Sequence, residues 1–420
     1  MLWLTLLPTL SLLIWIYLLG FRGQFWRTEP CLESAATPAD FGTVAQAPSV
    51  CVVIPARNEA ELLPQTLRSL LTQDYPGPLS VVLVDDHSTD GTATIAQATA
   101  QQVLQSASAD QPSRTLTVLA AQPLPPGWTG KLWALEQGTQ CALSQSPTPD
   151  YILLTDADIH HDSQNLGRLV QQGRSLNLDL VSVIVRLRCD SFWEKVLIPA
   201  FVFFFQKLYP FRWVNIPAHP TAAAAGGCIL LRPTALQRIG GIRSIRDALI
   251  DDCTLAHTIK HSSPQSLGKN EERRMKNEGR ANPIWLGLST HTRSLRPYPT
   301  LQSIWDMVAR TAYTQLHYSP WLLLGTIIGM TVVYMVPVIM LIPTLWMQQW
   351  LGAIASLITL GLMAIAYFPS IRFYRCPPIL AFCLPSIALL YTLMTLDSAR
   401  RYGLGVKSSW KGRDYSVTDG

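Results

Sequence analysis

The chain has 420 residues, of which 48% are hydrophobic and 15% charged, with a formal net charge of +5. This composition is too apolar for a purely soluble enzyme. The modest positive charge lies near the apolar segments, which indicates contact with anionic lipid headgroups and argues against a nucleic acid partner. The eight cysteines have no paired or zinc-like spacing. We therefore expect reduced thiols in a cytoplasmic catalytic domain, and no disulfide framework.

The N-terminal stretch, residues 2–19, is almost uncharged and is about long enough to cross a bilayer. A cleaved signal peptide is the alternative, but no positive residue precedes the stretch and no small-x-small cleavage site follows closely. Arg22 and Arg27 come just after it, which favours a retained anchor with its C-terminal side in the cytoplasm. We predict a transmembrane anchor over residues 1–21 and a linker over residues 22–48.

Three more apolar segments lie near the C-terminus, at about residues 321–346, 351–368 and 378–396. Each approaches the roughly 20 residues that a spanning helix requires. One N-terminal and three C-terminal spans would place the tail outside, yet the tail is basic, and the positive-inside rule keeps it in the cytoplasm. Either one segment is re-entrant or one splits in two. We predict a transmembrane region of about three spans over residues 311–397 and a basic tail over 398–420.

Residues 49–310, between the apolar ends, alternate strand and helix patterns. Residues 50–54 and 81–84 are continuous apolar runs typical of buried strands, and residues 61–71 between them have apolar side chains at helical spacing. Strand, helix and strand in this order predict a right-handed crossover and a parallel sheet. The same patterns predict further strands at residues 116–120, 151–155 and 180–185, and a helix at 92–103. The fold class is therefore α/β, with a mostly parallel, Rossmann-like sheet flanked by N- and C-terminal transmembrane helices.

Two segments of this domain are unusual. Residues 193–213 contain an apolar run that is too short to span a membrane. A helix buried in the protein core is one interpretation; we favour a helix in the membrane interface, with Trp193, Tyr209 and Trp213 at headgroup level. Residues 262–282 are charged and polar without periodicity, which predicts a mobile surface insertion.

Two acidic side chains, Asp156 and Asp158, follow directly on a predicted strand. Carboxylates two residues apart can share one divalent cation, because such ions prefer hard oxygen ligands. At the C-terminal edge of a strand they face the crevice where open α/β sheets bind ligands. Gly-rich phosphate loops are absent from the sequence, so metal and basic side chains must meet any diphosphate charge. The pattern predicts a divalent-cation site at this edge.

The loops after the first two predicted strands also carry polar side chains. In a parallel sheet both loops emerge at the same edge, where a carboxylate can accept hydrogen bonds from a base or a ribose hydroxyl. Asp86 follows Asp85 at the end of a buried strand, and two adjacent acids there seldom serve packing, so we assign Asp86 to a nucleoside. Asp90, before Gly91 and Thr92, is interpreted as a turn and helix-capping residue.

In their order, these motifs resemble the inverting family 2 glycosyltransferases of the GT-A fold, over about residues 50–310. The resemblance rests on four strings: Ile54-Pro55-Ala56-Arg57-Asn58-Glu59, Val84-Asp85-Asp86-His87-Ser88-Thr89-Asp90-Gly91-Thr92, Asp156-Ala157-Asp158 and Asp251-Asp252. It implies that a nucleoside is held by Pro55, Arg57, Glu59 and Asp86. It also implies that Asp156 and Asp158 bind Mg²⁺ or Mn²⁺ against the donor diphosphate.

Inverting transfer further needs a base that takes the proton of the acceptor hydroxyl. The family usually has Glu-Asp where this chain has Asp-Asp, and the resemblance implies that Asp252 is the base and Asp251 supports it. The alternative is a pair of acids stabilised by a helix dipole. Lys131 resembles the family's donor-contacting lysine, with a solvent-exposed lysine as the alternative. Gly227, in Gly226-Gly227-Cys228, could let the backbone approach the donor sugar.

Longer strings resemble the hopene-associated glycosyltransferases, a membrane branch near the ceramide glucosyltransferases. They comprise Trp128-Thr129-Gly130-Lys131-Leu132-Trp133-Ala134, residues 192–213, residues 221–227, Arg293-Ser294-Leu295-Arg296-Pro297-Tyr298, Ala309-Arg310-Thr311-Ala312-Tyr313 and Trp410-Lys411-Gly412-Arg413. This resemblance implies a lipid or polyterpenoid acceptor, in which case a hopanoid is one candidate. The Gln-x-x-Arg-Trp string of processive synthases has its nearest counterpart at residues 302–305, which lack the arginine, and this argues for a single transfer.

The sequence thus predicts a multi-pass membrane hexosyltransferase with a cytoplasmic catalytic domain and a bound Mg²⁺ or Mn²⁺. It would move one sugar, with inversion, from a nucleotide-sugar, for which we expect a UDP-sugar, to a membrane lipid. Two alternatives stay open. One is a processive polysaccharide synthase, and the other is a non-catalytic membrane scaffold with a degenerate transferase domain.

Overall fold

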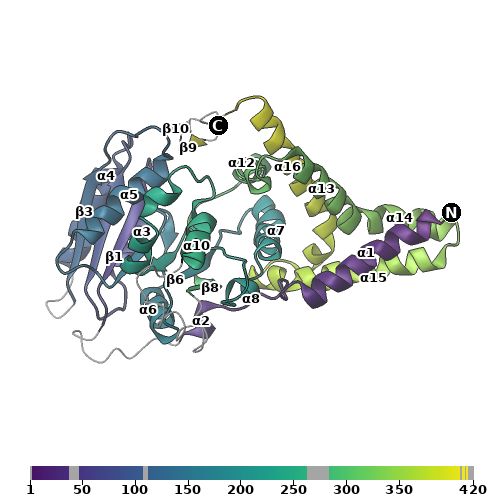
Figure 1. Ribbon diagram of the computed structural model, residues 1–420, viewed down its shortest axis with the longest axis horizontal. Helices are drawn as coiled ribbons and strands as arrows, with labels where there is room; N and C mark the ends of the chain where they lie inside the picture. The colour runs from purple at the N-terminus through teal and green to yellow at the C-terminus, as the bar shows by residue number, and fades with distance from the viewer. Residues whose placement is uncertain are drawn as a thin grey trace, which may run out of the picture. The chain divides into compact units, whose positions relative to one another are not determined.

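The computed structural model describes residues 2–36, 47–106, 112–262, 283–406, 409–411 and 413–414. The chain divides into two compact units (Figure 1). The helical unit comprises Met1–Thr28, Arg188–Arg212 and Pro297–Lys407, and the sheet unit comprises Glu29–Leu187, Trp213–Arg296 and Ser408–Gly420. The insertion predicted at 262–282 lies, after its first residue, outside the described residues.

The sheet unit is built on a sheet of eight strands within the described residues, in the order β3-β2-β1-β4-β7-β6-β8-β5. Strands β1 to β4 pair in parallel, in the order just given, whereas β7 runs antiparallel to both β4 and β6. Strand β8 pairs in parallel with β6 and antiparallel with β5. The predicted α/β class with a mostly parallel sheet is confirmed. The strands are β1 (Val50–Ala56), β2 (Leu79–Asp85), β3 (Arg114–Ala120), β4 (Tyr151–Leu154), β5 (Ile159–His160), β6 (Leu180–Arg186), β7 (Ile229–Leu231) and β8 (Ile284–Ser294).

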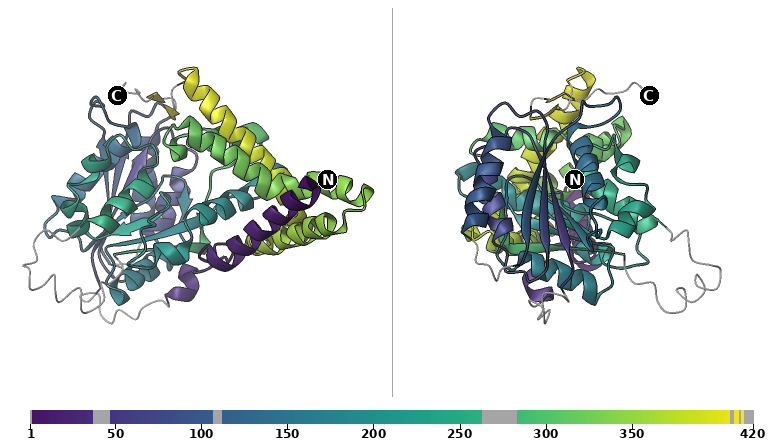
Figure 2. Two further views of the ribbon diagram at one scale, coloured as in Figure 1. Left: turned by 45° about the vertical axis from the view of Figure 1, so that its right-hand side comes forward. Right: turned by 90° about the vertical axis from the view of Figure 1, so that its left-hand side faces the viewer.

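Helices lie on both faces of this sheet (Figure 2), so its central strands are buried on both sides. Every residue of β1 is buried, which explains its unbroken apolar sequence. The helices predicted at 61–71 and 92–103 are present as α3 and α4. The helices of this unit are α2 (Leu32–Ala35), α3 (Leu63–Leu71), α4 (Thr92–Gln105), α5 (Gly130–Leu143), α6 (Asn165–Ser175), α8 (Phe211–Val214, shared with the helical unit), α9 (Pro233–Arg238) and α10 (Asp251–His261).

The end of the predicted linker is part of the sheet unit. Glu33 of α2 accepts hydrogen bonds through Oε1 from the Ser289 hydroxyl (2.6 Å) and the Thr290 N–H (2.9 Å) of β8. The Leu288 N–H donates to the Pro30 carbonyl at 2.9 Å. Residues 29–36 are therefore fixed on β8 by both backbone and side-chain hydrogen bonds.

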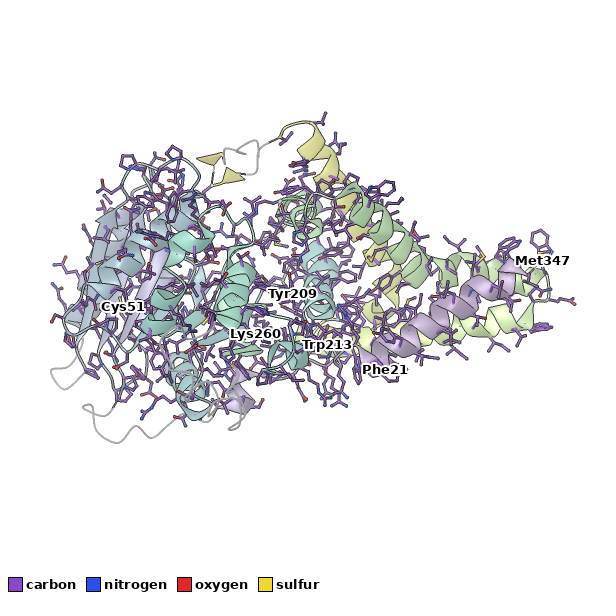
Figure 3. All side chains as sticks on the ribbon, viewed as in Figure 1. Phe21, Cys51, Tyr209, Trp213, Lys260 and Met347 are labelled. Carbon is purple, nitrogen blue, oxygen red and sulfur yellow. The ribbon has the colours of Figure 1, made fainter. Side chains whose placement is uncertain are left out.

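The helical unit contains α1 (Trp3–Phe21), α7 (Phe192–Leu208), α12 (Leu301–Ala309), α13 (Pro320–Met330), α14 (Val336–Trp346), α15 (Trp350–Phe373) and α16 (Leu384–Gly403). Within the part of the chain that the structure describes, four helices are long and apolar enough to cross a membrane: Trp3–Phe21, Pro320–Trp346, Trp350–Phe373 and Pro378–Gly403. Helix α1 packs along α14 and α15 (Figure 1), and Met347 marks the turn between the latter two (Figure 3). Large apolar side chains on these helices are exposed, among them Trp321 and Trp346 at 80% and 87%. Such surfaces suit lipid contact, and the four helices are candidate membrane spans.

Helix α7 contains the apolar run of residues 198–208. Phe203 is fully buried and lies 5.3 Å, between ring centroids, from both Phe25 and Tyr367. The Tyr391 hydroxyl donates to the carbonyl of Leu197 at 2.9 Å. The middle of α7 is thus packed inside the helical unit, as the core-helix interpretation expects, whereas Phe192 at its start is exposed. An interfacial position for residues 193–213 stays a prediction.

Candidate active site

The loops that follow β1 and β2 emerge together, because the two strands are parallel and Ala56 lies opposite Asp85. The Asn58 N–H donates to the Ser88 hydroxyl and the Glu59 N–H to the Thr92 hydroxyl, both at 2.9 Å. Two loops that carry predicted nucleoside ligands therefore form one cross-linked edge of the sheet.

Arg57 and Asp86 lie side by side at this edge. One Arg57 Nη donates to the Asp86 carbonyl at 2.5 Å and lies 3.7 Å from Asp86 Oδ2. The Asp86 side chain is only 1% exposed, and a neighbouring guanidinium offsets part of the cost of burying a carboxylate. Asp90 accepts hydrogen bonds from the Ala60 and Thr92 N–H groups, which agrees with the capping role expected for it.

A second group of charges surrounds Lys131 in the first turn of α5. Its Nζ lies 3.1 Å from Asp156 Oδ1 and 3.1 Å from Asp251 Oδ2. Thr129 fixes this turn, because its hydroxyl caps the helix by accepting from the Leu132 N–H. Although burial lowers the pKa of Lys131, the neighbouring carboxylates outweigh burial and raise that pKa above its ordinary value. We name Lys131, Asp156, Asp251 and Asp252 the lysine cluster.

Asp252 is held by the backbone within this cluster. Its Oδ2 accepts from the Gly226 N–H at 2.9 Å, and its Oδ1 accepts from the Cys253 N–H at 2.7 Å. Burial and the adjacent charge of Asp251 raise the pKa of Asp252 to about 6. A carboxylate with such a pKa is suited to proton transfer near neutral pH.

The lysine cluster lines a pocket. The structure brings Lys131, Asp156, Asp251 and Asp252 to this pocket together with Pro55, whereas Asp86 and Asp158 are not among its lining residues. The polar or charged lining comes from Lys131, Thr155, Asp156, Gly226, Asp251 and Asp252, and the apolar lining from Pro55, Leu132, Leu135, Leu154, Ile229, Ile242, Ile245 and Leu255.

Of the two adjacent glycines, Gly226 lines the pocket. A Cβ at Gly226 would lie 3.2 Å from Lys131 Nζ and 3.6 Å from Asp252 Oδ2. Gly227 instead packs where a Cβ would lie 3.3 Å from Val185, and its carbonyl accepts from the Thr155 hydroxyl at 2.7 Å. Gly226 therefore lies beside the charged groups of the pocket, and Gly227 holds the loop before Asp156; the approach of the donor sugar to Gly227 stays a prediction.

Asp158 belongs to a different group of charges, centred on Arg296. Arg296 donates through Nε to Asp158 Oδ2 at 2.5 Å and through an Nη to Glu59 Oε1 at 2.6 Å. The Leu295 N–H also donates to the Asp158 carbonyl at 2.8 Å, which places Arg296 beside the loop. Glu59 Oε1 lies 3.0 Å from Lys411 Nζ as well. We name Glu59, Asp158, Arg296 and Lys411 the arginine cluster; the sequence did not predict Arg296 or Lys411 as partners of these acids.

His161 has a structural role in the same loop. Its Nε2 lies 3.0 Å from the Thr155 hydroxyl and its Nδ1 lies 3.0 Å from Asn165 Nδ2. Burial lowers the pKa of His161 to about 3, so the ring is neutral at physiological pH.

The predicted metal site is tested by the donor groups present. Asp156 and Asp251 already converge on one ammonium group, so carboxylates from two loops can share a cation at this place. Among the described residues, no group of three or more His, Cys, Asp or Glu side chains could hold a metal ion. Mg²⁺ commonly takes one or two carboxylates and completes its shell with substrate phosphates. Asp156 pairs with Lys131, whereas Asp158 pairs with Arg296, so the shared metal site of Asp156 and Asp158 stays a prediction that depends on a bound diphosphate.

Comparison with known proteins gives one family match. Residues 51–240 match the family model described as Glycosyl transferase family 2. No curated protein matches the chain significantly. The match covers the first three of the four motifs, while Asp251-Asp252 lies beyond it, and it agrees with the predicted α/β fold of the GT-A type.

Several solved structures are similar to this chain. The mannosyltransferase PcManGT from Pyrobaculum calidifontis, in complex with GDP-Man and Mn²⁺, has 18% identity and a TM-score of 0.49, covering 94% of this chain and 99% of its own. Glucosyl-3-phosphoglycerate synthase of M. tuberculosis has 14% identity and a TM-score of 0.37, covering 69% and 85%. Mannosyl-3-phosphoglycerate synthase from Rubrobacter xylanophilus has 14% identity and a TM-score of 0.39, covering 69% and 80%. Because these likenesses are low, the functional assignment depends on the family match and on the site.

Proposed function

We propose that the protein, whose residues 51–240 match the model of Glycosyl transferase family 2, moves a single sugar from a nucleotide-sugar to a hydroxyl of a membrane lipid, with inversion. The observation that carries the proposal is the lysine cluster. One pocket brings together a half-buried carboxylate whose pKa is raised to about 6, a lysine, and the first acid of the Asp-x-Asp string. These are the groups that such a transfer requires.

The reaction assigns a role to each of these groups. The acceptor oxygen attacks the anomeric carbon, the bond from that carbon to the diphosphate oxygen breaks, and the diphosphate leaves with the electron pair. Asp252 takes the proton of the acceptor hydroxyl. The ammonium of Lys131 stabilises negative charge that develops on the leaving diphosphate. Asp251, 3.1 Å from Lys131 Nζ, orients that ammonium and raises the pKa of Asp252.

Donor recognition is assigned to the cross-linked edge. Asp86 and Arg57 would bind the nucleoside, with Glu59 and Pro55 on the same loop. A metal ion would be held by Asp156 and Asp158 together with diphosphate oxygens, and when bound it would offset charge on the diphosphate. We assign Mg²⁺ or Mn²⁺ to this position, because both prefer oxygen ligands.

A lipid acceptor is supported by the four candidate membrane spans. A chain with so much exposed apolar surface has its natural place in a bilayer, and a hydroxyl-bearing membrane lipid is the substrate available there. The resemblance of the longer strings to hopene-associated glycosyltransferases supports a hopanoid or related polyterpenoid as the acceptor.

The sheet unit is proposed to lie in the cytoplasm. Basic residues follow α1 (Arg22 and Arg27), whereas residues 347–349, between α14 and α15, contain no Lys or Arg. Arg372 and Arg375 mark the end of α15. The positive-inside rule then supports one cytoplasmic side for the ends of α1 and α15.

The tail supports the same arrangement. Lys411 is ion-paired with Glu59 inside the sheet unit, so the tail and the catalytic domain share one side of the membrane. An even number of the three C-terminal candidate spans must then cross. We propose that Pro320–Trp346 and Trp350–Phe373 cross as a hairpin and that Pro378–Gly403 does not. The ion pairs of Asp397 with Arg400 and Arg401 on α16 agree with an end outside the hydrocarbon core.

Reporter fusions in a bacterial host test this topology. A green fluorescent protein fused after Gly420 should fluoresce, because its barrel folds in the cytoplasm, and an alkaline phosphatase fused after Gln348 should be active outside. The reciprocal fusions serve as controls and should be inactive. An active phosphatase after Gly420 would instead mean that an odd number of the three C-terminal segments cross.

The proposed activity is tested with the full-length protein purified in detergent or nanodiscs. UDP- and GDP-sugars should each be supplied with a membrane lipid extract, and release of the nucleoside diphosphate measured. We expect lipid-dependent release and one added sugar per lipid, whose anomeric configuration by NMR is opposite to that of the donor. A non-catalytic scaffold would release none, and a processive synthase would give products that lengthen with time.

A further inference from the structure

The C-terminal tail returns to the first loop of the sheet. Strands β9 (Ser409–Trp410) and β10 (Arg413–Asp414) form an antiparallel pair, and Lys411 lies in the turn between them. Lys411 Nζ lies 3.0 Å from Glu59 Oε1 and donates to the Asn58 carbonyl at 3.3 Å. The Lys411 carbonyl accepts from Arg57 Nε at 3.2 Å. One tail residue thus contacts three consecutive residues of the loop after β1.

The contact between Lys411 and Glu59 matters because Glu59 is a poorly exposed charged residue. The Glu59 side chain is only 9% exposed, and burying a carboxylate is costly unless it is paired. Glu59 takes one cation from Arg296, which also holds Asp158, and a second from Lys411. Both cations contact the same oxygen, Glu59 Oε1, so Lys411 shares with Arg296 the neutralisation of this poorly exposed carboxylate.

The loop that Lys411 holds has a demanding conformation. Asn58 has a φ of +50°, in the left-handed region that non-glycine residues seldom occupy. Its N–H and side chain hydrogen-bond to Ser88 and Thr89 of the neighbouring loop. Because Arg57 and Glu59 flank this residue, their orientation depends on contacts made on both sides of Asn58, and Lys411 supplies three of them.

We propose that Lys411 is a positioning residue for the donor: it holds Arg57 and Glu59 in the orientation that binds the nucleoside diphosphate. The proposal rests on the function proposed above, since it takes the loop after β1 as part of the donor site. It makes the last residues of the chain, far outside the family 2 domain, part of donor binding. Donor affinity then depends on a segment attached directly to the last apolar helix.

The test uses the full-length protein in nanodiscs, with UDP and GDP as binding probes in the presence of Mn²⁺. For the nucleotide that binds the parent protein, Lys411→Gln should weaken affinity about tenfold, the loss typical of a charge-assisted hydrogen bond. The KM for the nucleotide-sugar should rise to the same extent, with kcat within about twofold. Lys411→Arg should restore most of the affinity. Arg68→Gln, which removes an exposed positive charge bonded to Gln102, is the matched control and should change nothing.

A double-mutant cycle locates the effect. When Glu59 is already replaced by glutamine, Lys411→Gln should lower nucleotide affinity much less than it does in the parent protein. The reason is that the effects of two substitutions that remove the same interaction do not add. Unchanged nucleotide affinity in Lys411→Gln, or a loss matched by Arg68→Gln, would overturn the proposal. So would a lowered melting temperature in Lys411→Gln that accounts for the loss, since Lys411 would then be a structural residue.

The two proposals fail in different ways. If the parent protein binds a nucleotide but transfers no sugar, the proposed function fails, while the affinity of Lys411→Gln still decides the role of the tail. If transfer occurs and Lys411→Gln has the parent's KM and affinity, the tail proposal alone fails. A parent protein that binds neither nucleotide would contradict both.

Discussion

Replacing Asp252 with asparagine is expected to lower sugar transfer by about 10²- to 10⁴-fold, the usual contribution of a general base, while nucleotide affinity stays nearly unchanged. The reason is that the asparagine amide would keep the shape of the side chain but could not take the acceptor proton. Initial rates and nucleotide binding should be measured on the same preparation. Asp247→Asn makes the same chemical change at an exposed residue just before α10 and should leave the rate intact. Parent-like turnover in Asp252→Asn would remove the assignment of the base.

The pH dependence gives an independent check on this base. Since Asp252 must be deprotonated to act and its pKa is raised to about 6, the rate should rise as the pH increases through about 6 and level off above it. Asp251 is one cause of the raised pKa, so Asp251→Asn should move this rise to lower pH. A rise at the same pH in both proteins would show that another group controls the acidic limb.

Replacing Asp158 with alanine is expected to abolish the metal-dependent part of nucleotide binding. Asp158 has two possible roles, as a metal ligand and as the partner of Arg296, and the metal dependence separates them. Nucleotide affinity should be measured with Mn²⁺ and with a chelator in the parent and the variant. If Asp158 is a metal ligand, the nucleotide affinity of Asp158→Ala should equal that of the parent protein with chelator, and Mn²⁺ should raise it only slightly.

The competing outcome for Asp158 is equally specific. If Asp158 only holds Arg296, the variant should lose the same factor in affinity with and without Mn²⁺, and Mn²⁺ should still strengthen its binding. Asp150→Ala provides the control, because Asp150 accepts its hydrogen bonds from Ser49 at the opposite end of β4. Metal-independent binding by the parent protein would contradict the metal assignment altogether.

Much of the fold could be predicted because it depends on local patterns. The buried strands β1, β2, β4 and β6 are unbroken apolar runs, and the long apolar helices have no alternative but lipid or a large core. Strands β7 and β8 were not predicted. The first has only three residues, and the second contains Ser289 and Thr292, which are fully buried but hydrogen-bonded. Polar residues that find partners in the folded chain leave no strand pattern in the sequence.

The candidate site was predictable only in part, for a related reason. Loops at the ends of parallel strands must meet at one edge, so the grouping of Arg57, Glu59 and Asp86 followed from strand order. The assignment of Lys131 and Asp252 to the site depended on the resemblance to a family, because neither residue follows a predicted strand. Arg296 and Lys411 are single basic residues without a pattern, and each reaches Glu59 through tertiary contacts with residues more than 200 positions away.

Tertiary contacts also explain why Asp156 and Asp158 belong to different charge clusters. Their spacing suggested one shared cation, but the Leu295 N–H bonds the Asp158 carbonyl while Lys131 pairs with Asp156. The two carboxylates therefore point into different charge clusters. A donor diphosphate between the clusters would give both acids a common ligand, which is what the metal titration of Asp158→Ala examines.

Lipid mass spectrometry tests the central claim most directly. Cells should carry the parent protein, the Asp252→Asn variant or no protein, with the two proteins at equal levels in the membrane. Our account predicts a lipid bearing one added sugar that is present with the parent protein and missing from both other extracts. The same lipid profile in all three would contradict it.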